Sequence, residues 1–454
     1  MDALTRYLEQ QQDRFVSDLM GALRIPSVST DPARKDDCRR CAEHFAGELK
    51  RVGMTRAEVV PTNGHPVVYA EWLGAPGKPT VLLYGHYDVQ PPEPLELWDS
   101  PPFEAVIRDG RMFGRGISDD KGHLVARLFA LDALLATHGE LPCRVKFAIE
   151  GEEETSSTHL HEFVLAHKDR LAADACVWEF GYVDDHGVPI QHLGLRGICY
   201  VELSVETASI DAHSGLGGSI FPNAAWRLTW ALASLKGPDE RIRVAGHYDR
   251  VRPPSERDRA IMAALPEGDA GLRERYGVRA FLRGLAGADL RVAEVFEPTC
   301  TICGLTSGYQ GPGSKTVLPA RASAKVDFRL VPDQTPEETV RLLRAHLDRA
   351  GFSDVQITFL GGEPPGRTDL DDPFAKLVVE TATDVYGQPM RVVPMVGGSG
   401  PNAMFIRDLG LPVVTAGLGY PDSRVHAPNE NIRIDLYLKH ARHMARVLEA
   451  FGRG

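Results

Sequence analysis

The chain has 454 residues, which is too long for one compact core and predicts two domains. Its 51 Lys and Arg residues against 62 Asp and Glu residues give a net charge of -11, which argues against a nucleic-acid-binding protein, because that class usually carries a basic excess or a basic stripe. No apolar stretch is long enough to span a bilayer, and the polar N-terminus MDALTRYLEQQQDRF has no signal-peptide pattern, so we expect no membrane partner.

Strand and helix patterns alternate over residues 1–197. Apolar, β-branched runs typical of strands cover residues 66–74, 80–88, 144–150 and 175–180. Between them, residues 123–139 carry apolar side chains at helical spacing and end in a glycine, a common stop signal. Strands separated by helices of this length predict an α/β sheet with parallel members.

The pattern changes over residues 198–360. Strand and helix signals follow the order β-α-β-β-α-β, which is the ferredoxin-like arrangement, with extra charged helical material around residues 255–290. After residue 361 the α/β pattern resumes and ends in a long helix. The sequence therefore predicts one discontinuous α/β domain, residues 1–197 and 361–454, with a ferredoxin-like domain, residues 198–360, inserted into it.

His86 and Asp88 lie at the end of the strand-like run TVLLYGHYD. Residues two apart on a strand point to the same side. Histidine is the commonest metal ligand, and a carboxylate beside it often fixes its tautomer. A turn with a hydrogen-bonded His–Asp pair is the alternative, and this segment alone does not separate the two interpretations.

Two acidic segments follow. GRGISDDKGH places Asp119 at a Gly-rich turn before a long helix, where a carboxylate can bridge two metals, although an acidic helix start is also favoured by the helix dipole. EGEEETSS places Glu153 and Glu154 directly after a strand, at the end where α/β sheets position their sites. A solvated acidic face is the alternative. Two adjacent carboxylates can divide the chemistry, because one binds metal while the other accepts a proton from water.

Two further candidate ligands occupy matching places in the sequence. Glu179 ends the strand-like run ACVWEF, and His426 lies in the turn-rich loop GYPDSRVHAPNENI. Together with His86, Asp119 and Glu154 they form a nitrogen and oxygen ligand set without a thiolate. Such a set suits zinc or manganese in a catalytic site.

In combination, these segments resemble those of the carnosinase-type dipeptidases, which are grouped with carboxypeptidase G, acetylornithine deacetylase and succinyl-diaminopimelate desuccinylase. The resemblance runs in order from residue 80 to residue 432. The segments that carry it are GHYDVQPP, GRGISDDKG, EGEEETSS, GLRGICYVELSVETASIDAHSG, GSKTVLP, FRLVPDQTPE, GGSGP and SRVHAPNE.

The resemblance implies a hydrolase with two divalent metal ions per subunit, zinc first and manganese or cobalt as alternatives. Asp119 and a water molecule would bridge the metals. His86 and Glu179 would hold one metal, and Glu154 and His426 would hold the other.

The family pattern also implies roles for neighbouring groups. Asp88 would orient His86, and Glu153 would be the general base. The Asp119–Asp120 peptide bond would be cis.

The inserted domain would be a lid that also forms the interface of a homodimer. Its His213 would reach the partner's site and stabilise the tetrahedral oxyanion. Arg329 would hold the substrate carboxylate, helped by Ser399 and by Thr316 from across the dimer.

Two departures from the carnosinase pattern leave the substrate open. Carnosinases usually carry Asp where this chain has Glu179, and Glu where it has Val396. We therefore expect cleavage of dipeptides or small peptides with a free C-terminal carboxylate, with N-acyl-amino-acid amidohydrolase activity as the alternative. A non-catalytic binding protein on the same scaffold is a remote alternative, because such a protein needs no base at Glu153.

The remaining motifs are interpreted as structural. Seven cysteines, thinly spread, suit a reducing compartment and predict a cytoplasmic protein. The pairs Cys38/Cys41 and Cys300/Cys303 lie too far apart for a zinc ribbon. A second Gly-His-Tyr-Asp, at 246–249, lacks a buried strand before it.

Overall fold

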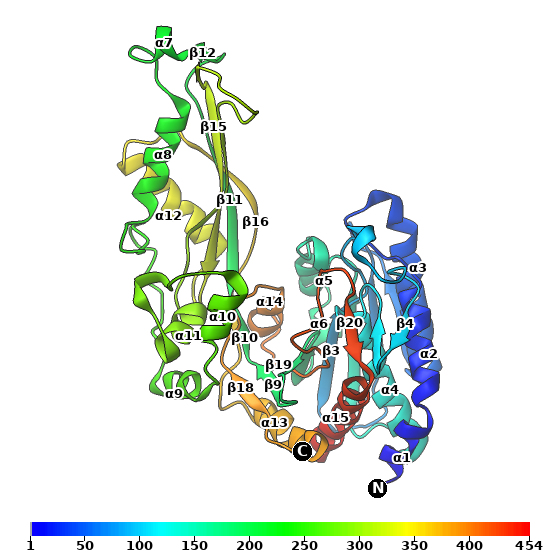
Figure 1. Ribbon diagram of the computed structural model, residues 1–454. Coiled ribbons are helices and arrows are strands. Elements are labelled where there is room, and N and C mark those ends of the chain that lie inside the picture. The colour runs from blue at the N-terminus through cyan, green and yellow to red at the C-terminus, as the bar shows by residue number, and fades with distance from the viewer. Residues whose placement is uncertain (1) are drawn as a thin grey trace. The chain divides into compact units, whose positions relative to one another are not determined.

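The computed structural model describes residues 2–454, and these divide into two compact units (Figure 1). Unit 1 contains the described residues up to Gly194 together with Arg367–Pro394 and Pro401–Gly454. Unit 2 contains Leu195–Gly366 and Met395–Gly400. The chain passes from one unit to the other within β10 (Gly194–Leu195) and β17 (Gly366–Arg367).

A six-stranded mixed sheet forms the centre of unit 1 in the described part of the chain. β3, β6, β7 and β19 run parallel, whereas β1 and β2 are antiparallel additions at one edge. All seven residues of β3 are buried, as expected for a strand covered on both faces. The spatial order is β1 (Arg56–Val60), β2 (Val67–Trp72), β6 (Arg144–Glu150), β3 (Thr80–His86), β7 (Ala175–Trp178) and β19 (Val413–Thr415).

The helix that follows β3, α4 (Lys121–His138), is buried on nearly every side. It ends at Gly139, whose left-handed backbone lets its N–H bond to the Leu135 carbonyl. Apolar residues all around a helix are typical of a position inside the fold. The other helices of unit 1 are α1 (Ala3–Gln10), α2 (Gln12–Leu23), α3 (Lys35–Arg51), α5 (Leu160–Ala166), α6 (Lys168–Leu171), α13 (Pro373–Tyr386), α14 (Asn402–Arg407) and α15 (Ile434–Arg453).

Two small sheets complete unit 1. One has the order β20 (Asn431–Arg433), β5 (Arg111–Phe113) and β4 (Val106–Arg108). The other has the order β18 (Arg391–Val393), β9 (Pro189–His192) and β8 (Tyr182–Val183). Both join strands from the two sequence pieces of the unit, so neither piece completes the fold alone.

Unit 2 is built on a four-stranded antiparallel sheet over residues 197–363, with the order β13 (Thr301–Ser307), β15 (Arg321–Leu330), β11 (Gly197–Glu206) and β16 (Gln356–Glu363). With α8 (Ala224–Leu235) and α12 (Pro336–Arg349), the chain order is β-α-β-β-α-β. Buried and partly exposed residues alternate along β11, so one face of the sheet packs on these helices. Thr335 caps α12 ahead of Pro336, a standard helix start.

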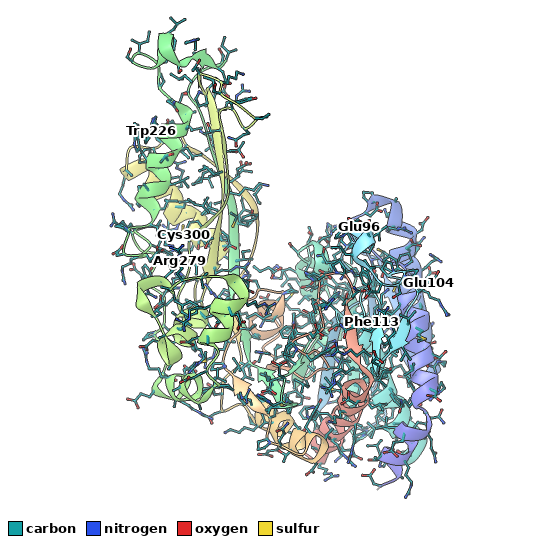
Figure 2. The ribbon with its side chains drawn as sticks, in the orientation of Figure 1. Glu96, Glu104, Phe113, Trp226, Arg279 and Cys300 are labelled. Atoms are coloured by element: carbon teal, nitrogen blue, oxygen red, sulfur yellow. The ribbon has the colours of Figure 1, made fainter. Side chains whose placement is uncertain are left out.

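Several short elements extend unit 2. The charged stretch predicted around residues 255–290 is helical, and Trp226 marks an exposed apolar position on α8 (Figure 2). The elements are β12 (Ala212–His213), α7 (Ser214–Gly217), α9 (Glu256–Ala264), α10 (Asp269–Tyr276), α11 (Gly287–Phe296) and β14 (Val317–Leu318).

The structure confirms the parallel α/β sheet expected from the sequence. The predicted strands appear as β2, β3, β6 and β7, and the helix predicted at 123–139 is α4. None of the helices within residues 2–454 combines the length and the apolar character needed to cross a membrane.

Candidate metal centre

The proposed ligands lie where the parallel strands of unit 1 end. His86 is the last residue of β3, Glu179 directly follows β7, and Glu154 lies in a short 3-10 helix, Glu153–Thr155, after β6. Asp119 lies in the turn before α4. Because parallel strands present their carboxyl ends at one edge of the sheet, groups far apart in sequence meet there.

The Asp119 carboxylate is the centre of the cluster. Its Oδ1 lies 2.9 Å from Nε2 of His86, and its Oδ2 lies 3.0 Å from Nε2 of His426. Oε2 of Glu154 lies 3.2 Å from the same His426 nitrogen. His86, Asp119 and Glu154 offer ligand atoms that all lie within 4.8 Å of one another. One carboxylate between two imidazoles is an arrangement that can bridge two cations.

Two buried carboxylate oxygens support a metal at this place. In the described part of the chain, Oε1 of Glu154 and Oε2 of Glu179 have no hydrogen-bond partner. The other oxygen of Glu179 accepts a 3.1 Å hydrogen bond from the Trp178 indole. An unpaired carboxylate oxygen is costly to bury, whereas a cation would satisfy it. The residues therefore fit a divalent metal bound by nitrogen and oxygen.

Burial and hydrogen bonding within the cluster shift the pKa values of its residues. Burial disfavours ionisation of Asp119, but hydrogen bonds from His426 and His86 outweigh this and hold its pKa below the usual range. Hydrogen bonds to Asp119 and Glu154 raise the pKa of His426 to about 10. Burial raises the pKa of Glu153 well above its ordinary value, and the His86 charge offsets this only in part. A carboxylate with a raised pKa is a stronger base.

Asp88 connects the cluster to the segment that carries Glu153. Its buried carboxylate accepts hydrogen bonds from the Ser29 hydroxyl at 2.6 Å and from the backbone N–H groups of Glu153 at 3.3 Å and Glu154 at 3.1 Å. Nδ1 of His86 lies 3.0 Å from the Asp88 carbonyl oxygen and 3.4 Å from its Oδ1. Asp88 thus touches the His86 ring and also holds the following acidic turn.

Three supporting residues were not singled out from the sequence. Buried Glu430 accepts hydrogen bonds from the Arg115 guanidinium and from the backbone N–H groups of the turn, including that of Asp119 at 3.1 Å. Gln90 donates to Glu154 at 2.8 Å. Buried Arg127 donates to backbone carbonyls of β3 and β7. A charge inside the apolar helical run HLVARLFALDALL was the one available signal for Arg127.

The Asp119 turn leaves no room for a side chain at Gly122. A Cβ there would lie 2.0 Å from the Ile117 carbonyl oxygen, which belongs to the same turn. The Asp119–Asp120 peptide bond is cis, as the family resemblance predicts.

We expect Gly122→Ala to lower the free energy of unfolding by about 1–3 kcal/mol, the usual cost of overpacking, and to weaken metal binding because the turn must shift. Thermal unfolding and zinc titration would measure both effects. Gly47→Ala is the matched control, because Gly47 lies inside α3 and a Cβ added there would have nothing within 4 Å. Ala is the better helix former, so this control should unfold at the same temperature or higher. Equal behaviour of the two variants would contradict the steric argument.

The predicted substrate-binding residues lie at two places in unit 2. Arg329 donates a 2.8 Å hydrogen bond to the Ser399 hydroxyl. His213 pairs with Val317 between β12 and β14, next to Thr316, whose carbonyl accepts from the Ser214 N–H. These places are separated by most of β15, since the eight steps from Arg321 to Arg329 span roughly 26 Å at about 3.3 Å per residue.

The cysteines and the second Gly-His-Tyr-Asp motif, interpreted as structural from the sequence, lie outside the metal cluster. In the described residues all seven cysteines are free thiols, and only Cys303 is exposed. His247, in the second Gly-His-Tyr-Asp, is buried, and burial lowers its pKa to about 4.

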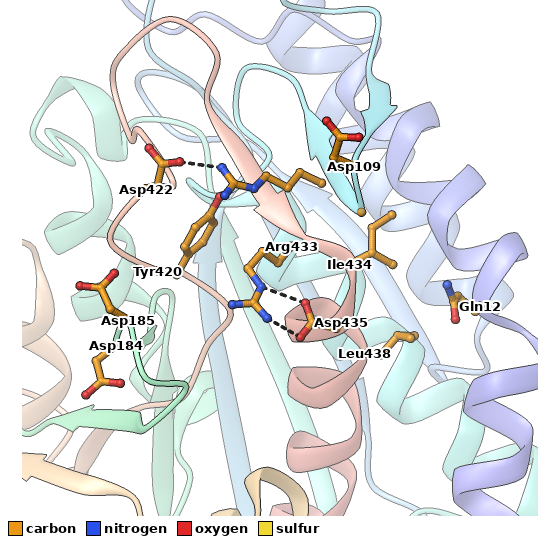
Figure 3. A pocket seen from close by; sticks show the side chains of 12 residues that line it. Gln12, Asp109, Asp184, Asp185, Tyr420, Asp422, Arg433, Ile434, Asp435 and Leu438 are labelled. Atoms are coloured by element: carbon orange, nitrogen blue, oxygen red, sulfur yellow. Dashed lines mark hydrogen bonds and ion pairs between the residues drawn. The ribbon is translucent and has the colours of Figure 1, made fainter.

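A hollow of about 790 Å³ in unit 1 contains none of the proposed ligands (Figure 3). Its two arginines are paired, Arg111 with Asp422 at 2.6 Å and Arg433 with Asp435 at 2.8 Å. This hollow therefore offers little to an anionic substrate.

Known proteins resemble the chain over nearly its whole length. It is 27% identical to the Cys-Gly metallodipeptidase dug1 of Schizosaccharomyces pombe, covering 97% of this chain and 96% of that one. It is 28% identical to the Beta-Ala-His dipeptidase of Rattus norvegicus, covering 95% and 92%. The crystal structure of an M20 family metallo-carboxypeptidase, Sso-CP2 from Sulfolobus solfataricus, superposes with a TM-score of 0.90 at 36% identity, covering 97% and 99%.

The model of peptidase family M20/M25/M40 matches residues 82–450, which include every proposed metal ligand. The mixed α/β fold agrees with the solved structures of this family. This chain therefore belongs to peptidase family M20/M25/M40 and is a metallopeptidase.

Proposed function

We propose that this metallopeptidase is a dipeptidase that holds two divalent metal ions in unit 1. Zinc is the proposed metal, with manganese or cobalt as alternatives. The observation that carries the proposal is the Asp119 carboxylate, which has one oxygen beside His86 and the other beside His426. His86 and Glu179 would hold one metal, and Glu154 and His426 would hold the other. When bound, such metals polarise the scissile carbonyl and make a water molecule acidic enough to ionise near neutral pH.

Glu153 is the general base. It accepts a proton from the attacking water and delivers it to the amine that leaves. Burial raises the pKa of Glu153, which suits both steps. Asp88 orients His86 mainly through its backbone carbonyl oxygen, and its carboxylate accepts from the Glu153 backbone N–H, so ligand and base are positioned by one residue.

Unit 2 is proposed to be the lid and the dimerisation domain. Arg329, steadied by Ser399, binds the carboxylate at the C-terminal end of the substrate. His213 and Thr316 lie at the other end of β15, too far from Arg329 for one dipeptide to touch both places in one chain. A twofold homodimer resolves this separation, because each site then receives Arg329 and Ser399 from one chain and His213 and Thr316 from its partner.

We propose dipeptides as the substrates because two relatives of this chain are named as Cys-Gly and Beta-Ala-His dipeptidases. N-acyl amino acids are the second candidate. Val396 stands where carnosinases have Glu, so one acidic partner for a substrate amine is missing at the segment that carries Ser399.

A substrate panel tests the proposal. Chelator-treated protein should be inactive, and zinc or manganese should restore hydrolysis of free dipeptides, with N-acetylated counterparts of the same dipeptides as the matched set. Metal that binds only the folded state should also raise the unfolding temperature as its concentration rises. Faster hydrolysis of the acetylated set would replace the dipeptidase proposal with the amidohydrolase. Absence of hydrolysis in both sets at full metal loading would contradict both.

A further inference from the structure

The gap between β3 and β7 opens where the metal cluster begins. Backbone pairing of these two strands ends at Leu83 and Val177. On its other side, β3 stays paired with β6 as far as His86 and Glu150. Backbone hydrogen bonds thus fix the spacing between the ends of β3 and β6, but not between the ends of β3 and β7.

Arg127 fills this gap from α4. Its guanidinium donates to the Tyr84 carbonyl of β3 at 2.7 Å, to the Trp178 carbonyl, and to the Glu179 carbonyl at 2.8 Å. The side chain is fully buried. One planar group therefore replaces the missing strand pairing with hydrogen bonds to both strands.

The three elements that Arg127 joins carry three of the proposed ligands. Tyr84 is two residues before His86, and the Glu179 carbonyl belongs to a ligand itself. α4 begins directly after the turn that holds Asp119. Glu154 follows β6 and His426 precedes β20, and Arg127 makes no hydrogen bond to either segment in the described residues.

We propose that Arg127 is a positioning residue that sets the spacing between His86 and Glu179, and so determines the affinity of the metal held by this pair rather than that of the metal held by Glu154 and His426. The inference rests on the proposed two-metal site. It makes the two metals energetically distinct, because in the described part of the chain Arg127 donates hydrogen bonds to the segments of His86 and Glu179 but not to those of Glu154 and His426.

The test is metal titration of the chelator-treated full-length protein by calorimetry, with Co²⁺ absorption as a coordination signature. In Arg127→Met, which keeps the length of the chain but no donor, we expect one of the two metals to bind about 10- to 100-fold more weakly, the range typical of losing an outer-shell partner. The Co²⁺ spectrum of the remaining site should match that of Glu179→Gln, which damages the same metal position.

Two further variants keep the result interpretable. Arg127→Lys keeps the charge but not the planar fork, and should bind the weakened metal with intermediate affinity. Arg344→Met is the matched control, because Arg344 also donates to two backbone carbonyls, those of Val355 and Phe352, but in unit 2. It should bind both metals like the wild type.

Several outcomes would overturn the inference. Wild-type affinities for both metals in Arg127→Met and Arg127→Lys would remove any positioning role. An equal loss at both metals would mean general destabilisation, and circular dichroism with thermal unfolding of the metal-free variants would show its extent. A wild-type protein that does not bind two metals would instead contradict the proposed dinuclear site, and with it this inference.

Discussion

The Glu153→Gln variant is expected to lose about 10²- to 10⁴-fold in kcat while it keeps its fold and both metals, because that is the usual contribution of a positioned general base. Gln has the shape of Glu but cannot accept the proton of the attacking water. The backbone N–H of residue 153 would still donate to Asp88, so the acidic turn keeps its place. Steady-state kinetics and metal analysis of the same preparation measure the effect.

Glu152→Gln is the control for Glu153. Glu152 belongs to the same acidic run, but its carboxylate lies 2.9 Å from Nδ1 of His159 and not in the metal cluster. We expect this variant to retain turnover within a few-fold of the wild type, in line with the loss of one hydrogen bond at a distance from the reacting atoms. Near-normal kcat in metal-loaded Glu153→Gln would remove Glu153 from the proposed role.

The second large effect concerns His213. We expect His213→Ala to lower kcat by about 10²- to 10³-fold, the scale of losing one oxyanion donor. The Gly215 N–H donates to Nδ1 of His213, so in the neutral ring the proton resides on Nε2. The exposed side chain therefore presents a hydrogen-bond donor, which is the group that a developing oxyanion requires.

Mixing two inactive variants tests whether His213 serves the partner. In a hybrid dimer of His213→Ala with Glu153→Ala, the first chain keeps its base and receives an intact histidine from the second. Random exchange of an equal mixture would give about a quarter of the sites this intact combination, since half of the dimers are hybrids and each has one such site. Recovery near that level supports a shared site. Persistent inactivity, with hybrids demonstrated by native mass spectrometry, would mean that His213 does not act across a dimer.

Local pattern was sufficient to predict strands β2, β3, β6 and β7 of the unit 1 sheet, though not β1, and the positions of the cluster residues. The run that became β3 is apolar throughout and ends in His86, so strand and candidate ligand could be recognised in one segment. The acidic residues after β6 were informative for the same reason. Functional sites of α/β proteins lie at the carboxyl ends of their parallel strands, so charged residues just after a strand are candidate site residues.

Contacts that depend on tertiary packing could not be predicted in this way. Glu430 accepts hydrogen bonds from backbone N–H groups of the Asp119 turn. Glu430 and Asp119 are 311 residues apart in the sequence. The same holds for Arg127, because its acceptors are carbonyl oxygens, which every residue possesses. The return of residues 395–400 to unit 2, which places Ser399 beside Arg329, likewise has no sequence signal.

The interruption of unit 1 by unit 2 sets an order of events during synthesis on the ribosome. His86, Asp119, Glu154 and Glu179 leave the exit tunnel before unit 2, and His426 leaves it long after. The nascent chain thus displays four anionic or imidazole ligands while β19 and α15, which complete the sheet and its cover, are still missing. Unit 2 can fold as a unit in this interval, since domains generally do so as they emerge. Secure retention of the two proposed metals must then wait for the last part of the polypeptide to be made.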